Sequence, residues 1–422
     1  MDIFLGIDLG SSGCRVIAID GQARQIAELS APWPAYLDDP ALTEQDPWMW
    51  WETLSILLHK LTSTVPPENI RALAVGGTSA TLLLCDERGE PLGQALMYND
   101  ARARDEAVKL SAIAPREFPV HSPSSALAKL LYLQKQPQMK NARHAMHQAD
   151  WVAGKLCGQY GISDENNCLK LGYDINQRCW PEWFDAVGVE ERLLPRVVAP
   201  GTVIGTIDRI VGQQLGLHPN TAIVAGTTDG VAAFLASGAK ESGEAVTSLG
   251  STLVIKLLSD RYINSWEHGI YSHRLQDKWL VGGASNCGGA VVLKYFSKQQ
   301  LKTLTPQLNP RQPTGLNYYP LPSPGERFPF NDPDKQPHLN PRPDDDIQFL
   351  QGILEGIADV EARSYQLLAE LGAPYPTVVY TLGGGSCNQY WAEMREQRLE
   401  VPVKNAVHQQ AAYGVALLAR SV

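Results

Sequence analysis

Two stretches of this chain repeat one pattern, in which a short apolar run of β type ends in a Gly-Ser turn and returns as a second run. The first stretch has such runs at residues 4–8, 15–20 and 23–29, separated by Gly-containing turns. The second has runs at 245–249, 253–257 and 269–273, with Gly250 and Ser251 in its first turn. A meander of this kind opens an α/β domain, so its repetition predicts two similar domains.

The rest of the chain alternates strand-like and helix-like segments. Asp46 and Pro47 are typical of a helix start, ahead of helical apolar spacing over 48–61. Segment 305–343 is rich in proline and predicts an irregular loop. The remaining predicted elements are strands at 72–75, 81–85 and 377–382 and helices at 124–134, 150–156, 345–371, 389–399 and 409–420. We place the boundary near 237–243, giving domains 1–237 and 238–422, and allow the last helix to pack back on the first domain.

Composition excludes several classes of function. The chain has 422 residues, 44% of them hydrophobic, and a net charge of −9 without a basic block, which argues against nucleic acid as a partner. No 18-residue apolar stretch and no signal peptide is evident, so we expect no membrane association and a cytoplasmic location. Seven cysteines without a C-x-x-C pair predict reduced thiols, and His144 and His147 lack a nearby third metal ligand.

The first candidate site follows the opening run. Asp8 precedes a hairpin containing Ser11, Ser12 and Gly13, and such a turn can direct backbone N–H groups and hydroxyls toward an anion. One carboxylate beside phosphates is also a suitable partner for Mg²⁺. Taken alone, the segment is more typical of a plain β-turn.

Three further Gly-rich turns carry candidate residues. Asp229 follows the apolar run 222–224 and Gly226, where it is either a functional carboxylate or a helix N-cap. A second turn contains Gly250, Ser251 and Thr252. In the third, Gly384 and Gly385 precede Asn388, and successive glycines let a planar ligand lie against bare backbone.

In this order and spacing, the motifs resemble the FGGY carbohydrate kinases, relatives of hexokinase, Hsp70 and actin. The resemblance covers nearly the whole chain. It rests on residues 8–13, 98–102, 128–133, 226–229, 249–252, 325–330 and 383–388. It implies an α/β fold of two actin-like (ribonuclease H-like) domains around a cleft, and the use of ATP and Mg²⁺.

The resemblance also assigns roles by position. Asp229 is expected to be the catalytic base and Asp8 the magnesium carboxylate, with both near the sugar. Ser11, Ser12 and Gly13, together with Gly250, Ser251 and Thr252, are expected at the phosphates, and Gly384, Gly385 and Asn388 at the adenosine. Ser79, Asp100 and Arg102 are expected on the sugar side, where a buried bracing network is an equally good interpretation. Lys129 is expected to be structural.

Substrate preference follows from departures from the family pattern. Xylulokinases usually carry a Met-His pair where this chain has Ser79 and Ala80, so D-ribulose is expected before D-xylulose, with phosphorylation at the terminal hydroxyl. Another small sugar or polyol is the next alternative. Hypotheses from another class are an actin-like or Hsp70-like ATPase and a catalytically silent sugar sensor. The protein is expected to be a monomer or a homodimer.

Overall fold

The computed structural model describes residues 1–34 and 42–422 and divides into two compact units. Unit 1 comprises Met1–Ala236 and Gln410–Val422, and unit 2 comprises Ser237–Gln409. The chain therefore returns to unit 1 at its end, whereas a single division at residue 237 would leave residues 410–422 in the second domain. Glycine at position 6 makes this return sterically possible. Any larger residue would place its Cβ only 1.9 Å from the carbonyl oxygen of Ala412, in the last helix.

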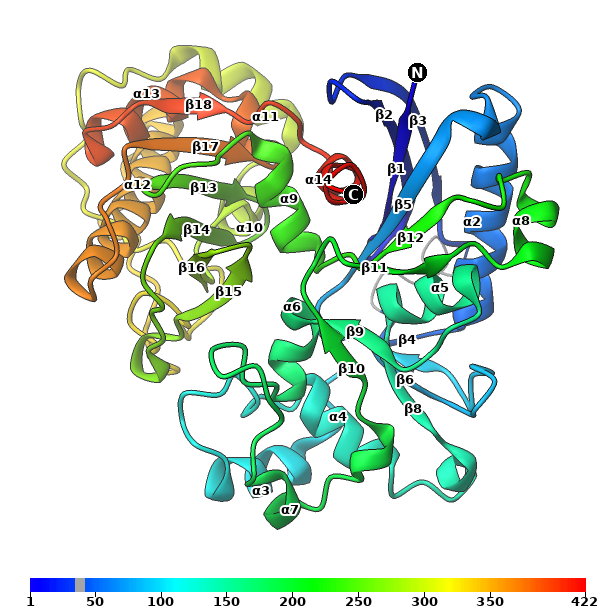
Figure 1. Cartoon of the computed structure of the whole chain (residues 1–422). Helices are drawn as coiled ribbons and strands as arrows, with labels where there is room; N and C mark the ends of the chain where they lie inside the picture. The colour runs from blue at the N-terminus through cyan, green and yellow to red at the C-terminus, as the bar shows by residue number, and fades with distance from the viewer. Residues whose placement is uncertain (35–41) are drawn as a thin grey trace. The chain divides into compact units, whose positions relative to one another are not determined.

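Unit 1 is built on a six-stranded sheet of order β11-β12-β5-β1-β2-β3 (Figure 1). Its strands are β1 (Ile3–Leu9), β2 (Gly13–Asp20), β3 (Gln25–Pro32), β5 (Ile70–Gly77), β11 (Val203–Thr206) and β12 (Ala222–Val224). β1, β5 and β12 run parallel, and β2, β3 and β11 pair antiparallel with their neighbours. The carboxyl ends of the three parallel strands therefore meet at one edge of the sheet.

Helices cover both faces of this sheet. They are α2 (Pro47–Thr62), α5 (Gln148–Cys157), α8 (Arg209–Leu215), α9 (Asp229–Ser237) and α14 (Ala411–Ala419). Alternate residues of β1 enter different cores, because Ile3 packs with α2 and α5 whereas Phe4 packs with α9 and α14. The predicted start of α2 is confirmed, since the Asp46 side chain accepts a hydrogen bond from Trp48 N at 3.0 Å.

A smaller layer of unit 1 carries the segments expected on the sugar side. It contains a four-stranded sheet of order β4-β7-β6-β8, a two-stranded sheet and several short helices. The elements are β4 (Glu44–Gln45), β6 (Leu82–Cys85), β7 (Ala95–Leu96), β8 (His144–His147), β9 (Ile162–Asp164), β10 (Arg196–Val198), α3 (Arg104–Ile113), α4 (Ala126–Leu133), α6 (Glu165–Cys168) and α7 (Phe184–Val187).

Unit 2 has a sheet of the order β15-β16-β14-β13-β17-β18, whose last five strands pair in the same directions as β3, β2, β1, β5 and β12 of unit 1. Its elements are β13 (Glu244–Leu249), β14 (Leu253–Ser259), β15 (Tyr271–Leu275), β16 (Lys278–Ser285), β17 (Val378–Leu382), β18 (Val403–Asn405), α10 (Gly289–Tyr295), α11 (Lys298–Leu304), α12 (Asp346–Glu370) and α13 (Gln389–Leu399). The run at 269–273 corresponds to β15. It is not the third strand of the meander, because the unpredicted strand β16 pairs with both β14 and β15.

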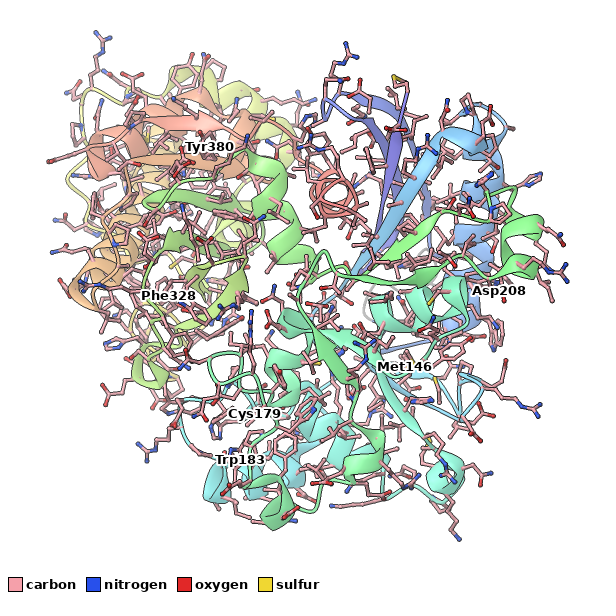
Figure 2. All side chains as sticks on the ribbon, viewed as in Figure 1. Met146, Cys179, Trp183, Asp208, Phe328 and Tyr380 are labelled. Atoms are coloured by element: carbon pink, nitrogen blue, oxygen red, sulfur yellow. The ribbon has the colours of Figure 1, made fainter. Side chains whose placement is uncertain are left out.

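The proline-rich segment at 305–343 is irregular, as predicted, apart from a short 3-10 turn at Thr305–Gln307 and isolated bridges. Phe328 (labelled in Figure 2) is fully buried. Its ring fills the space that Gly283 of β16 leaves, since a Cβ on Gly283 would lie 2.7 Å from the ring. The segment is thus packed on the sheet of unit 2. In the described ranges, no helix is both long and apolar enough to span a membrane.

Candidate active site

The carboxyl edge of the unit 1 sheet brings three predicted site residues onto neighbouring segments. Asp8 stands on β1 opposite Gly76 of β5, and Ser79 follows β5. The turn after β12 continues the sheet, with Gly77 N donating to Thr227 O at 3.3 Å, and leads directly into α9 at Asp229. This geometry explains how residues far apart in the sequence meet at the ends of parallel strands.

Asp229 is the first residue of α9 and is half-buried. Its Oδ1 accepts a hydrogen bond from Gly230 N at 2.7 Å. The turn before it approaches β5 closely, because a Cβ on Gly226 would lie 1.8 Å from the carbonyl oxygen of Val75. Only glycine fits there, and this close approach holds the Asp229 carboxylate beside the neighbouring strand ends.

Asp8 lies within electrostatic range of Asp229. Burial, and after it the negative charge of Asp229, raise the pKa of Asp8 to about 7 against the opposing positive charge of Arg15. Asp8 Oδ1 is buried and has no hydrogen-bond partner in the described part of the chain. A buried carboxylate oxygen without a donor beside a second carboxylate is a suitable place for a cation.

The donor set fits Mg²⁺ shared with phosphates better than a site made by protein alone. Mg²⁺ commonly takes one or two carboxylates and completes its shell with waters and substrate phosphates. Among the described residues, no group of three or more His, Cys, Asp or Glu side chains could hold a metal by itself. Asp8 would therefore hold Mg²⁺ as one contributor, with phosphate oxygens and water as the others.

The hairpin after Asp8 is stabilised by hydrogen bonds that its backbone carbonyl groups accept. Gly10 N donates to Gly13 O at 2.9 Å, and the fully buried Trp33 donates through Nε1 to Gly10 O and through N to Ser12 O, both at 2.9 Å. These bonds use the carbonyl groups of the turn. Ser11 is half-buried and Ser12 is exposed, which suits hydroxyls that would bind phosphate.

On the expected sugar side, Ser79 differs from Asp100 and Arg102 in its hydrogen bonding. Ser79 Oγ is buried without a hydrogen-bond partner in the described residues. Asp100 is buried and bound by Arg102 through N, Nε and Nη2 at 2.7–3.0 Å, and Arg102 also contacts Glu44 Oε1 at 2.5 Å. The Asp100–Arg102 pair thus braces its own loop, and the hydroxyl of Ser79 is left unpaired.

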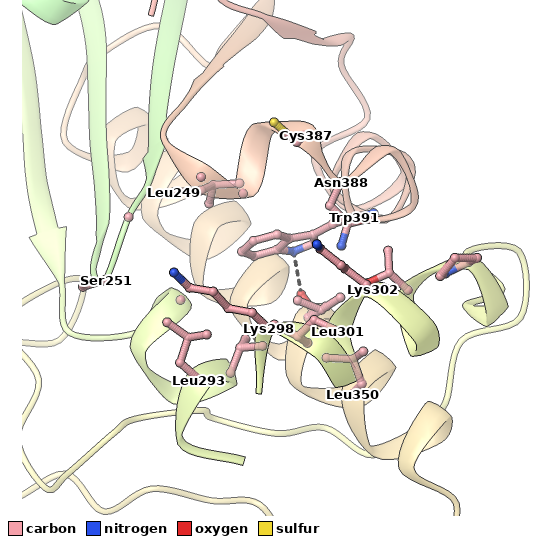
Figure 3. A pocket seen from close by; sticks show the side chains of 18 residues that line it. Leu249, Ser251, Leu293, Lys298, Leu301, Lys302, Leu350, Cys387, Asn388 and Trp391 are labelled. Carbon is pink, nitrogen blue, oxygen red and sulfur yellow. Dashed lines mark hydrogen bonds between the residues drawn. The ribbon is translucent and has the colours of Figure 1, made fainter. Parts of the chain in front are cut away.

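A separate pocket of about 760 Å³ lies within unit 2 (Figure 3). Its walls combine the turn after β13 with the Gly-rich turn after β17, and they include four predicted residues: Gly250, Ser251, Gly384 and Gly385. Asn388 also lines the pocket, and its side chain caps α13 by accepting from Trp391 N at 3.0 Å. Thr252 closes the first turn by accepting from Gly250 N at 3.2 Å.

Sequence reasoning missed the buried tryptophan and both lysines that line this pocket. Trp391 is buried in its wall and donates from Nε1 to Leu354 O at 3.0 Å. Lys298 and Lys302 are exposed, stand one helical turn apart on α11 and extend their ammonium groups along the pocket (Figure 3). Their i, i+4 spacing was visible in the sequence, but nothing there linked α11 to the distant Gly-rich turns.

A pocket with an apolar wall, bare glycine backbone and two cations suits a nucleotide, and a carboxylate edge suits a divalent cation and proton transfer. Solved structures show the same fold. A xyloylose kinase from Brucella ovis aligns with a TM-score of 0.89 at 24% identity, over 99% of this chain and 90% of its own. A gluconate kinase from Lactobacillus acidophilus aligns with a TM-score of 0.88 at 17% identity, over 100% and 89% of the respective chains. The fold is therefore that of the two-domain, actin-like ATPases.

Sequence comparison then defines the family. The pattern of the FGGY family of carbohydrate kinases matches with its N-terminal domain at residues 3–236 and with its C-terminal domain at residues 245–421. A xylulose kinase from Escherichia coli (strain K12) is 23% identical over 412 residues, which are 93% of this chain and 84% of that protein. The chain belongs to the FGGY family of carbohydrate kinases, which confirms the resemblance inferred from the motifs.

Proposed function

We propose that this sugar kinase transfers the γ-phosphoryl group of ATP to the terminal hydroxyl of a ketopentose. The observation that carries the proposal is the pair Asp8 and Asp229 at the carboxyl edge of unit 1, where the buried Asp8 Oδ1 has no hydrogen-bond partner among the described residues. The nucleotide would occupy the pocket of unit 2, with its base near Gly384 and Gly385 and its phosphates toward Gly250 and Ser251.

Asp229 would act as the general base. Its Oδ1 is oriented by Gly230 N, so the carboxylate can accept the proton of the sugar hydroxyl as that oxygen attacks the γ-phosphorus. The new O–P bond forms while the bond from phosphorus to the bridging oxygen of ADP breaks. Mg²⁺ held with the help of Asp8 would neutralise charge on the phosphate oxygens, and Ser11 and Ser12 would donate hydrogen bonds to them.

D-Xylulose is the first candidate substrate, ahead of the D-ribulose expected from the sequence, because the Escherichia coli relative is named a xylulose kinase. D-Ribulose is the second, because Ser79 and Ala80 stand where xylulokinases usually carry a bulkier Met-His pair. The unpaired Ser79 Oγ can bind one sugar hydroxyl, and an epimer that leaves it unpaired loses about 1–3 kcal/mol. One such hydrogen bond would produce a preference of about tenfold or more between the two ketoses.

A coupled assay of ADP release tests the proposal. D-Xylulose, D-ribulose, gluconate, glycerol and a blank without sugar are compared by kcat/KM, and the position of the phosphate is read by mass spectrometry and phosphorus NMR. We expect a ketopentose to exceed gluconate and glycerol by at least about tenfold, which corresponds to about 1.4 kcal/mol in the transition state. A higher kcat/KM for gluconate or glycerol than for both ketopentoses would contradict the proposal.

A further inference from the structure

Lys129 of α4 is a fully buried lysine that reaches two separate segments of the sugar side. Its Nζ donates to Ala80 O at 2.8 Å and to Met97 O at 2.6 Å. Ala80 directly follows Ser79, and Met97 precedes the loop that contains Asp100 and Arg102. One ammonium group therefore ties together both segments that carry the candidate sugar contacts.

Burying the charged Lys129 side chain costs free energy that a purely structural role does not require. No carboxylate lies within ion-pair distance of its Nζ in the described part of the chain, and a buried charge without a counter-ion is unfavourable. Burial lowers the pKa of Lys129 to about 7, with Lys170 and Arg102 acting in the same direction and Asp100 opposing them. A methionine would fill the same space without this cost, so the two carbonyl bonds need a function.

The segment that Lys129 holds is strained. Ala80 has a φ of 67°, in the left-handed region that a residue with a Cβ rarely adopts. A second tie supports the same turn, since Thr81 Oγ1 accepts from Tyr98 N at 3.0 Å and bonds Thr78 Oγ1 at 2.6 Å. Both ties join the turn after β5 to the loop at 97–102, and together they fix where Ser79 Oγ stands.

We propose that Lys129 is a positioning residue that holds Ser79 and the Asp100–Arg102 loop in their sugar-binding arrangement. This inference rests on the proposed function and assigns Lys129 to sugar recognition and not to nucleotide binding. The nucleotide pocket is formed by residues of unit 2 only, so loss of the tie should leave ATP affinity unchanged.

The test compares Lys129→Met with the matched surface variant Lys60→Met. Lys60 is exposed on α2, outside the segments of the sugar side, so its loss should change neither sugar nor ATP kinetics. We expect Lys129→Met to raise the KM for the preferred sugar at least about tenfold, with the Kd for ATP changed by less than about twofold. An unchanged sugar KM, or parallel losses of sugar and ATP affinity, would overturn the proposal.

Thr81→Val is the second variant, because it removes the other tie without emptying the core and decides the question if Lys129→Met does not fold. We expect its sugar KM to rise about threefold or more at constant ATP affinity, and an unchanged KM would count against the proposal. Wild-type protein that phosphorylates no tested sugar would contradict the proposed function. In that case, amide hydrogen exchange of residues 78–80 and 97–102 decides on the tie: faster exchange in the variants supports it, and equal exchange refutes it.

Discussion

The two units have separate sheets of similar topology, but they differ in the residues at the ends of the strands. In unit 1, β1 runs into its hairpin through Asp8 and Leu9, and in unit 2, β13 does so through Ser248 and Leu249. The parallel neighbour of each ends in a Gly-rich turn, which leads to Ser79 after β5 and to Gly384 after β17. Equivalent positions thus carry a carboxylate in one unit and a hydroxyl in the other.

The difference indicates that the sheet topology places both candidate sites at strand ends and that the strand-end residues set which ligand each site suits. The unit 1 edge carries the carboxylates of Asp8 and Asp229, which suit Mg²⁺ binding and proton transfer. In unit 2, the buried pair of Glu361 and Arg395 lies outside the proposed nucleotide pocket: Arg395 donates to both oxygens of Glu361 at 2.6–2.7 Å and to Thr381 Oγ1 at 2.7 Å. We therefore expect the Asp8–Asp229 pair of unit 1 to serve function and the Glu361–Arg395 pair of unit 2 to serve stability.

The largest effect should come from breaking the buried pair of unit 2. Arg395→Met leaves Glu361 buried and unpaired, and we expect the free energy of unfolding to fall by about 3–5 kcal/mol. Arg398→Met on the same helix removes an exposed pair with Asp359 and should cost no more than about 1 kcal/mol. Urea unfolding followed by fluorescence measures both, and equal losses would show that the buried pair has no special structural role.

The next effect concerns the functional charge of unit 1. Asp229→Asn should lower kcat by about 10²-fold or more, because the amide cannot accept the hydroxyl proton, while ATP affinity stays unchanged. Asp208→Asn is the control, since Asp208 caps α8 by accepting from Ile210 N and Val211 N, and Asn caps equally well. A near-normal kcat for Asp229→Asn at saturating substrates would remove it as the base.

A smaller effect is expected from filling the neutral turn of unit 2. A Cβ on Gly384 meets no atom within 4 Å, so Gly384→Val should fold normally and narrow the pocket. We expect the Kd for ATP, measured by calorimetry, to rise about tenfold while sugar affinity is kept. Gly21→Val adds the same side chain to open space in unit 1 and should change neither affinity. Unchanged ATP binding in Gly384→Val would place the nucleotide elsewhere.

The smallest effect is a gain in stability at the unit 1 edge. The pKa of Asp8 is raised from 3.8 to about 7, so the folded protein binds this proton more tightly than the unfolded chain, and stability falls as pH rises from about 4 to 7. Asp8→Asn removes that dependence. Without Mg²⁺ or nucleotide, its Tm should exceed the wild-type Tm by about 2 °C or more at pH 8, and by less at pH 5. A lower Tm at pH 8 would show that ionised Asp8 stabilises the fold.

Much of the fold could be predicted from local signals. The bounds 389–399 are those of α13, and α12 begins one residue after Asp345, whose side chain caps it. Strand β16 was missed because Gly282 and Gly283 are typical of a turn. In the structure they serve close packing, since a Cβ on Gly282 would lie 1.9 Å from Ile255 O of the neighbouring strand. Only tertiary contact reveals such a reason for glycine.

The residues of the candidate site also fall into two groups, those that local sequence motifs predict and those that depend on tertiary contacts. Asp8, Asp229 and the Gly-rich turns could be proposed as site residues from the sequence because each lies in a short strand-turn motif. Trp391 and Lys129 were not assigned to the site, because their positions depend on segments far apart in the sequence: Trp391 bonds Leu354 O, and Lys129 joins carbonyls 49 and 32 residues away. Local patterns predict candidate ligand-binding turns and do not predict the side chains that distant packing brings to them.

The central claim is that the carboxylates at the edge of unit 1 support transfer of the γ-phosphoryl group of ATP to a sugar hydroxyl. The most direct test is whether ADP formation by the wild-type protein depends on sugar. ADP release is measured with ATP and Mg²⁺, with and without D-xylulose or D-ribulose, and sugar phosphate is quantified in the same sample. The account predicts that sugar raises ADP formation at least about tenfold over the blank, with one sugar phosphate per ADP. ATP turnover that is independent of sugar, as in an actin-like or Hsp70-like ATPase, or binding of sugar and ATP without turnover, as in a sensor, would contradict it.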